Sequence, residues 1–146
     1  MITVDEIMTT DLVTLPDSAT VQDAVQLMEE KHIRHIPVVD AAGALIGLVS
    51  HRDVLASTDS TLRTQDQRQN PASVPLSKIM TRNVSTVEET TNLRNAALHI
   101  QKHKYGCLLV VTQGKLRGII TNSDFVAVAI NLLQQLDETE PPDLDF

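Results

Sequence analysis

Residues 47–53 read GLVSHRD and residues 118–124 read GIITNSD, so the chain carries one short pattern twice. Each copy is a glycine, two apolar residues, a serine or threonine, two variable residues and an aspartate. Further upstream, Ile7-Met8-Thr9 matches Ile79-Met80-Thr81. The upstream segments are 72 residues apart and the glycine-led motifs are 71 apart, so one residue is missing between them in the second copy. The chain is an internal duplication, and two similar units must build the fold.

Length and composition indicate one globular module. A unit of roughly 50–55 residues buries too little of its surface to be stable alone, whereas a chain of 146 residues can enclose a core. Charged residues make up 21% and hydrophobic residues 42%, which is typical of folded proteins. Aromatic residues make up 2%, so the core must be aliphatic. We therefore expect the two units to pack against each other.

The charge and the cysteine count exclude several classes of partner and location. A formal charge of −7 argues against nucleic acid, whose phosphates require a basic surface. The opening MITVDEIM lacks the basic start of a secretory signal, and no apolar run approaches the length of a membrane span. A single cysteine, Cys107, is typical of a reducing compartment. These features predict a cytoplasmic protein without a membrane or nucleic-acid partner.

Hydrophobic periodicity predicts the order β-α-β-β-α in each unit. A short strand around Thr14 precedes a helix, and Thr20 with Asp23 is a capping box for that helix. The apolar helical positions are Val21, Ala24, Val25 and Met28 in the first unit and Leu93, Ala96, Ala97 and Ile100 in the second. Two strands joined by a turn at residues 40–43 come next, and a second helix follows them.

The predicted boundaries follow from this order and from composition. The first repeat covers residues 1–56 and the second covers residues 75–136. Residues 57–74 are polar and are interpreted as a connector. Residues 137–146 are acidic and contain two prolines, which predicts a flexible tail.

On these motifs the chain resembles a tandem pair of CBS domains (cystathionine β-synthase-type repeats), called a Bateman module, over nearly its whole length. The resemblance rests on the two IMT segments, on Thr14 and Thr86, on IPVV at 36–39 and on the two G-x-x-[ST]-x-x-D endings. It implies an α+β fold of two β-α-β-β-α repeats related by pseudo-two-fold symmetry. It also implies that an adenosine-type nucleotide such as AMP, ADP or ATP binds in the cleft between the repeats.

The aspartate motifs have two interpretations that can hold together. The spacing of Ser50 to Asp53 and of Thr121 to Asp124 is that of a capping box, which satisfies free N–H groups at a helix start. Such a start also suits phosphate, and a carboxylate there can accept bonds from ribose hydroxyls. In proteins that the chain resembles, the Asp holds the ribose and the Ser or Thr lies near phosphate.

The resemblance assigns further candidate positions. It implies that the segments of Thr14 and Thr86, with the residue before Pro37, frame an adenine ring. The second copy departs from this pattern, because Leu108-Leu109 replaces Ile36-Pro37. The candidate ligand-binding residues are Thr14, Arg34, Ile36, Pro37, Ser50, His51, Arg52, Asp53, Thr86, Leu108, Thr121 and Asp124.

Local cations distinguish the two copies. His51-Arg52 stands where the second copy has Asn122-Ser123, and further cations lie at 34–35 and 102–104. They are either solvated surface charge or groups that neutralise an anionic ligand, for which the arginine fork suits phosphate. We expect two unequal sites, with the Asp53 motif the better equipped.

Catalysis and metal binding are not predicted. His99 and His103 are spaced i, i+4 on a helix, but no further ligand follows at metal-binding spacing. Cys107 opens an apolar strand, where a buried and inert thiol is the usual state. Because no nucleophile, base and orienting group converge at a plausible spacing, we expect that the chain is not an enzyme and requires no cofactor.

The leading hypothesis is a stand-alone regulatory module that binds an adenosine nucleotide between its repeats and signals in trans to an effector protein. The alternative is an interaction or scaffold protein of the same fold that binds no nucleotide. Modules that the chain resembles pair through their helices into homodimers. The apolar face of the last helix is either such a contact surface or part of the core, and its residues are Phe125, Ala129, Ile130 and Leu133.

Overall fold

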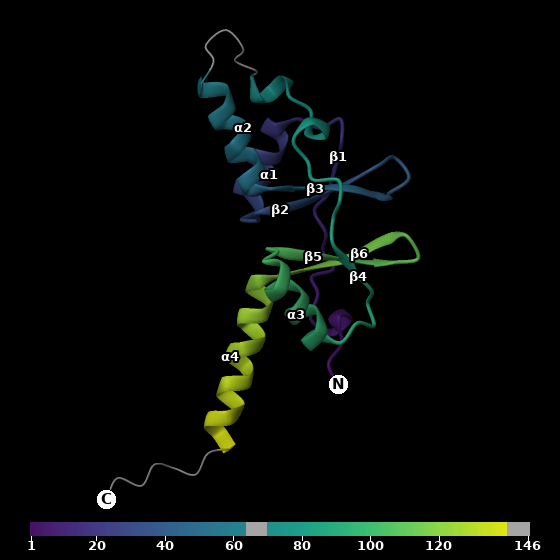
Figure 1. The fold of residues 1–146 in the computed structure, drawn as a ribbon, viewed down its shortest axis with the longest axis vertical. Coiled ribbons are helices and arrows are strands. Elements are labelled where there is room, and N and C mark those ends of the chain that lie inside the picture. Colours follow the sequence, from purple (N-terminus) through teal and green to yellow (C-terminus); the bar gives the residue numbers. More distant parts are fainter. Residues whose placement is uncertain (64–69, 140–146) are drawn as a thin grey trace, which may run out of the picture.

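The structure is a computed structural model that describes residues 1–63 and 70–139, with the backbone alone described at 59–63 (Figure 1). The elements of the first repeat are β1 (Leu15–Pro16), α1 (Val21–Lys31), β2 (His35–Val39), β3 (Leu45–Ser50) and α2 (His51–Arg63). Those of the second repeat are β4 (Thr86–Val87), α3 (Leu93–His103), β5 (Cys107–Thr112), β6 (Lys115–Thr121) and α4 (Asn122–Thr139). The predicted order β-α-β-β-α is confirmed in both repeats.

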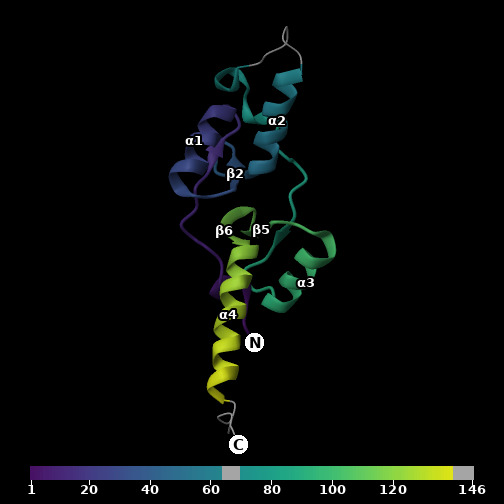
Figure 2. The same cartoon turned by 90° about the vertical axis from the view of Figure 1, so that its left-hand side faces the viewer.

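Each repeat forms a three-stranded sheet, in the orders β1-β2-β3 and β4-β5-β6. The first pairing in each sheet is parallel and the second is antiparallel. The hairpin turns place Gly43 at φ +84° and Gly114 at φ +78°, a region that glycine enters without a steric penalty. The two sheets lie next to each other in the middle of the molecule, and the helices of the two repeats extend to opposite ends (Figures 1 and 2).

Local sequence signals explain where the helices begin. The predicted capping box of α1 is confirmed, since the Asp23 N–H donates to Thr20 Oγ1 over 3.2 Å and the Thr20 N–H donates to Asp23 Oδ2 over 2.9 Å.

The predicted connector lies partly outside the described residues, and α2 extends into it as far as Arg63. The predicted tail lies outside them from residue 140 onward, and α4 continues to Thr139.

One face of each sheet packs against the helices as an aliphatic core. The first core joins Val21, Ala24 and Met28 of α1 to Ile36, Val38 and Val49 of the strands. The second core joins Leu93, Ala96 and Ile100 of α3 to Leu108, Val110 and Ile120 of the strands. Because successive strand residues point to opposite faces, the residues between these core positions point toward the other repeat.

Each core is completed by a segment that precedes the other repeat in sequence. Val4 is fully buried in the second core, and its N–H donates to the Thr91 carbonyl over 2.8 Å. Leu76 is fully buried in the first core, and its N–H donates to the Ala19 carbonyl over 2.8 Å. The expected division at residues 56 and 75 is therefore one of sequence, because in space the two repeats exchange their leading segments.

The exchanged segments explain the glycine that opens each repeated motif. A Cβ atom at Gly118 would lie 2.5 Å from Met8 Sδ, and a Cβ atom at Gly47 would lie 2.7 Å from Met80 Sδ. The backbones of Thr9 and β6 also exchange two hydrogen bonds, of 2.9 and 3.0 Å. Only a residue without a side chain lets the IMT segment of one repeat pass so close to a strand of the other.

Candidate functional site

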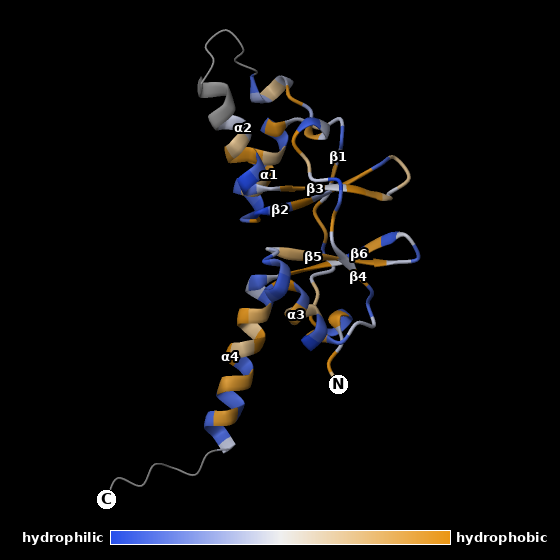
Figure 3. Ribbon diagram, in the orientation of Figure 1, coloured by the Kyte–Doolittle hydropathy of each residue, from blue (hydrophilic) through white to orange (hydrophobic). Residues whose placement is uncertain are grey.

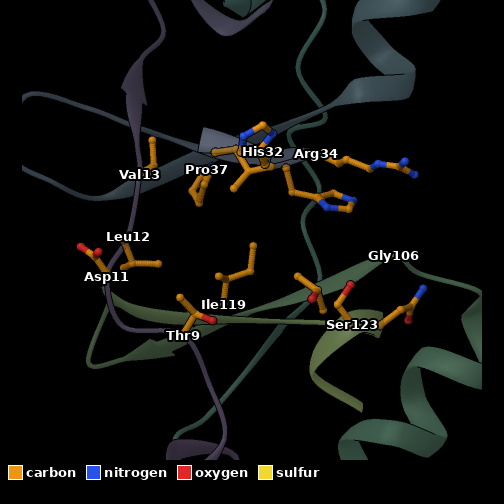
Figure 4. A pocket seen from close by; sticks show the side chains of 14 residues that line it. Thr9, Asp11, Leu12, Val13, His32, Arg34, Pro37, Gly106, Ile119 and Ser123 are labelled. Carbon is orange, nitrogen blue, oxygen red and sulfur yellow. The ribbon is translucent and has the colours of Figure 1, made fainter. Parts of the chain in front are cut away.

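Two cavities lie between the repeats, at positions that the internal duplication makes equivalent. The first, which we call the Thr121 cleft, is about 440 Å³ and is lined by residues within 9–13, 32–37 and 119–123 together with Gly106 (Figure 4). The second, the Ser50 cleft, is about 610 Å³ and is lined by residues within 48–55, 81–85 and 104–107 together with Arg34, His35 and Asn122. Both volumes fall in the range of roughly 300–1,000 Å³ that is typical of small-molecule sites.

Strand alternation delivers side chains to these clefts. In β3, Val49 points into the core while Ser50 lines the Ser50 cleft. In β6, Ile120 points into the core while Thr121 lines the Thr121 cleft. The hydroxyl of each repeated motif is thus placed by the register of its strand, on the face opposite the core.

Each cleft combines the helix start of one repeat with a strand start of the other. In the Thr121 cleft, Pro37 and His32 of the first repeat face Ile119 and Ser123 of the second across the cavity (Figure 4). Residues 51–53 lie instead in the Ser50 cleft, with residues 104–107 of the second repeat. The IPVV segment and the His51-Arg52 cations both belong to the first repeat. Pro37 of that segment nevertheless lines the Thr121 cleft, whereas the two cations line the Ser50 cleft.

The capping interpretation of the two motifs is confirmed. In the first, the Ser50 N–H donates to Asp53 Oδ2 over 2.8 Å, and the Asp53 N–H donates to Ser50 Oγ over 3.1 Å. The second motif forms half of the box: the Thr121 N–H and hydroxyl donate to Asp124 Oδ2 over 2.7 and 3.3 Å, and among the described residues the Asp124 N–H has no hydrogen bond to Thr121 Oγ1. Within the described part of the chain, the Oδ1 atom of neither aspartate accepts a hydrogen bond. Of the two aspartates, Asp53 also lines the Ser50 cleft, so its Oδ1 atom is the one left for a ligand there.

The structure brings most of the candidate residues to the clefts. Those in the Ser50 cleft are Arg34, Ser50, His51, Arg52 and Asp53. Those in the Thr121 cleft are Arg34, Pro37 and Thr121. Arg34 borders both cavities, and the residue at its place in the second repeat is Gly106.

The other candidates lie elsewhere, so a ligand role for them stays a prediction. Thr14 and Thr86 are exposed on or beside the short strands β1 and β4, outside both clefts. Asp124 caps α4 behind Thr121 and is not part of the cavity wall. The side chains of Ile36 and Leu108 are fully buried in the two cores. These two side chains therefore point to the other face of the sheet, and contact with adenine through their backbone groups stays a prediction.

His35, which was not among the candidates, lines both clefts. A Cβ atom at Gly106 would lie 2.9 Å from His35 Nε2, so the imidazole is seated against the backbone of the second repeat. Burial lowers the pKa of His35; the carboxylate of Asp53 opposes this shift and the guanidinium of Arg34 adds to it. The alternation of β2 could have revealed His35, because it lies two residues before Pro37 on the same face.

A cluster of three rings lies beside the Ser50 cleft. The Tyr105 ring lines the cavity and stacks on His103, with ring centroids 5.2 Å apart. His99 contacts both rings, and its Nε2 atom lies 2.9 Å from the Ser85 hydroxyl. Nowhere in the described part of the chain do three or more His, Cys, Asp or Glu side chains gather as metal ligands. The two imidazoles therefore pack behind Tyr105, which is the ring of this cluster that lines the cleft.

Cys107 lines the same cleft as a protonated thiol. Its side chain is buried, and burial raises the pKa of the thiol to about 12. The prediction that the thiol is buried is confirmed, and the raised pKa disfavours the thiolate, which is the nucleophilic form.

Comparison with known proteins identifies the family. The CBS domain model matches residues 4–58 and again residues 76–131. The chain belongs to the CBS-domain family. Its two matched segments correspond to the two repeats of the structure, so the chain is a tandem CBS pair.

Individual relatives support this assignment along the whole chain. The crystal structure of a Vibrio cholerae protein provisionally named as an acetoin utilization protein (AcuB) is 44% identical, with a TM-score of 0.81, and covers 97% of this chain and 99% of that one. The structure of CBSX2 in complex with AMP is 32% identical, with a TM-score of 0.77, over 91% of this chain and 99% of that one. CBSX1 of Arabidopsis thaliana is 35% identical over 92% of this chain.

The relatives differ in length and location. The CBS pair spans 67% of CBSX1 and 60% of full-length Arabidopsis CBSX2, both of which are named as chloroplastic. Relatives that are enzymes, such as the inosine-5′-monophosphate dehydrogenase of Methanocaldococcus jannaschii, are matched over about a fifth of their length, 22% in that case. Within residues 1–63 and 70–139, no helix is both long and apolar enough to cross a membrane. A cytoplasmic location stays a prediction.

Proposed function

We propose that this CBS pair is a regulatory, non-catalytic module that binds an adenosine nucleotide in the Ser50 cleft. One observation carries the proposal: the cleft places the capping carboxylate of Asp53 beside three cationic side chains, Arg34, Arg52 and Lys104. A carboxylate accepts the hydroxyls of a ribose, and cations with a helix start neutralise a phosphate. CBSX2, a relative of similar length in its crystal structure, binds AMP.

The test is an equilibrium titration of the purified chain with AMP, ADP, ATP and NAD, followed by calorimetry. We expect saturable binding of at least one adenosine nucleotide below millimolar concentration. GMP is the matched control for recognition of the base. The absence of saturable binding by every nucleotide would favour the scaffold hypothesis instead.

The output of such a module is a change in the relative placement of its repeats or protomers. Both clefts are walled by both repeats, so a bound ligand contacts each of them and favours the arrangement that it fits best. We propose that a separate effector protein reads this change in trans.

We also propose that the module is a homodimer joined through α4. The helix runs away from the body of the molecule with apolar residues along its length (Figure 3). Phe125 packs against the second core, whereas Ile130 and Leu133 are 53% and 59% exposed. Val126 and Leu136 are exposed on the same helix, which contains no lysine or arginine. We propose that the same face of a second copy covers these exposed apolar side chains, because its length matches and it is also apolar.

Replacing both Ile130 and Leu133 by glutamate should convert a dimer into a monomer. The like charges would repel and the apolar contact area would be lost. Light scattering coupled to gel filtration measures the change, with Leu98→Glu on α3 as a control at a position that is 49% exposed. A wild-type chain that runs as a monomer at high concentration would contradict the proposal.

A further inference from the structure

The second half of α4 stands clear of the body of the chain. Phe125 and Val128, near the start of the helix, pack against the second core. From Ala129 to Thr139 every residue is exposed, and the helix extends beyond the other elements of its repeat (Figures 1 and 2). The fold of a single chain therefore does not account for the apolar residues in this half.

These apolar residues follow a heptad pattern that has apolar flanks. Residues 126, 129, 133 and 136 are Val, Ala, Leu and Leu, which is the a/d seam through which two helices pair. Ile130 and Leu132 occupy the e and g positions on the two sides of this seam, where a two-stranded coiled coil usually has charged residues. Their side chains are 53% and 49% exposed.

The apolar band is too wide for one partner helix. Because Ile130 and Leu132 are two residues apart, about 200° of rotation separates them, and the seam fills the remaining arc of about 160°. A strict a/d seam is narrower than this, and apolar e or g positions are typical of helices inside a bundle. A second copy covers the seam and Ile130 in the proposed dimer, which leaves Leu132 at the far edge of the band.

Charge distinguishes the helices that could cover this edge. Residues 118–146 contain six acidic residues and no lysine, arginine or histidine. Two of the acids, Asp137 and Glu138, lie in the last turn of α4, where the helix dipole favours cations. Additional copies of α4 would bring more negative charge to this end, because the helix has no basic side chain. A helix with lysine or arginine beside its apolar face would instead neutralise both carboxylates.

The helix also connects this end of the molecule to the clefts. Its first residue, Asn122, lines both of them. With 18 residues the helix spans roughly 27 Å, so a change of orientation at its start moves its far end.

We propose that the effector protein docks on the second half of α4 through an amphipathic helix that has a leucine-type apolar face and flanking lysine or arginine residues. The inference rests on the proposed function, which requires a separate effector and pairs two α4 helices. It adds the place where the effector binds and the chemistry that selects it. Apolar side chains of the effector helix cover Leu132 beside the paired seams, and its cations meet Asp137 and Glu138.

A synthetic helix of this chemistry tests the docking surface. The probe is an 18-residue peptide, as long as α4, with leucine at a and d spacing and lysine at the flanking positions. The control peptide has glutamate in place of each lysine. Fluorescence anisotropy should show that the lysine peptide binds, that its affinity falls as salt is added, and that the glutamate peptide does not bind. Equal binding of the two peptides, or no binding of either, would overturn the inference.

Two variants separate docking from dimer formation and from nucleotide binding. Asp137→Lys with Glu138→Lys should weaken binding of the lysine peptide about ten-fold or more, because attraction becomes repulsion. Leu132→Gln, which keeps the charge, should weaken it by about ten-fold because an apolar contact is lost. Both variants should keep the wild-type mass in light scattering and the wild-type affinity for AMP, since neither change lies in the a/d seam or in a cleft.

The outcomes distinguish this inference from the proposed function. An unchanged peptide affinity in either folded variant would overturn the inference and leave nucleotide binding standing. A wild-type chain that forms tetramers without peptide would show that further copies cover Leu132, and would also overturn it. Failure of the wild-type chain to bind any adenosine nucleotide would overturn the proposed function, whatever the peptide does.

Discussion

Replacing Gly118 by valine should lower the thermal unfolding midpoint by roughly 10 °C. A Cβ atom there would lie 2.5 Å from Met8 Sδ and 3.0 Å from the Thr9 carbonyl oxygen. The sulfur can move, but the carbonyl oxygen accepts a hydrogen bond from the Ile119 N–H and cannot retreat without breaking it. Overpacking of this kind costs about 3 kcal/mol, and each kcal/mol shifts the midpoint of a chain of this size by about 2–4 °C.

Circular dichroism during heating measures this effect, and the chain offers its own controls. Gly47→Val should behave similarly, because its Cβ would lie 2.7 Å from Met80 Sδ. Gly114→Ala should cost about 1 kcal/mol, since its φ is +78° but no atom lies within 4 Å of the added carbon. Adding Met8→Ala to Gly118→Ala should recover part of the loss. A midpoint of Gly118→Val within about 2 °C of the wild type would contradict the close crossing of the segments.

Asp53→Ala should weaken AMP binding by about a hundred-fold or more. We expect two functions of this carboxylate: Oδ2 caps α2 through the Ser50 N–H at 2.8 Å, while Oδ1 accepts no hydrogen bond from the described residues and Asp53 lines the cleft. Two hydrogen bonds from ribose hydroxyls to a charged group contribute roughly 3 kcal/mol or more together, which corresponds to at least two orders of magnitude in affinity. Titration calorimetry with AMP measures the loss.

Asp124→Ala is the matched control that separates binding from capping. Its carboxylate caps α4 through a bond of 2.7 Å from the Thr121 N–H, so both variants should lose about 1 kcal/mol of stability. AMP affinity should fall in Asp53→Ala alone, because Asp53 lines the Ser50 cleft and Asp124 does not. If AMP affinity changed less than about two-fold in folded Asp53→Ala, the ribose role of Asp53 would be wrong.

Local signals in the sequence were sufficient to predict the elements of each repeat. Thr20 and Asp23 predict the start of α1 because a capping box involves residues only three positions apart. Asp40 and Gly43 predict the first hairpin because the turn needs a positive φ at the glycine. These interactions lie within a few residues, so a short stretch of sequence contains both partners.

Side-chain direction limited the prediction of the site. Ile36 and Pro37 are adjacent, yet Ile36 points into the core while Pro37 lines the Thr121 cleft. The apolar character of both residues is the same, so composition alone does not show which face each one occupies. His35 was named among the local cations but not as a ligand-binding candidate, because its contact with Gly106 joins two segments that are far apart in sequence.

The sequence by itself determined the duplication, the order of elements in each repeat, the two capped helix starts and the inequality of the two motifs. Each of these is written in residues that lie close together or recur at a fixed offset. Only the tertiary structure decided which groups share a cavity. The repeats exchange their leading segments, and His51 and Arg52 line one cleft with Lys104 of the second repeat while Pro37 lines the other with Thr121. Cavities are made by contacts between distant segments, and the packing of two sheets face to face sets those contacts.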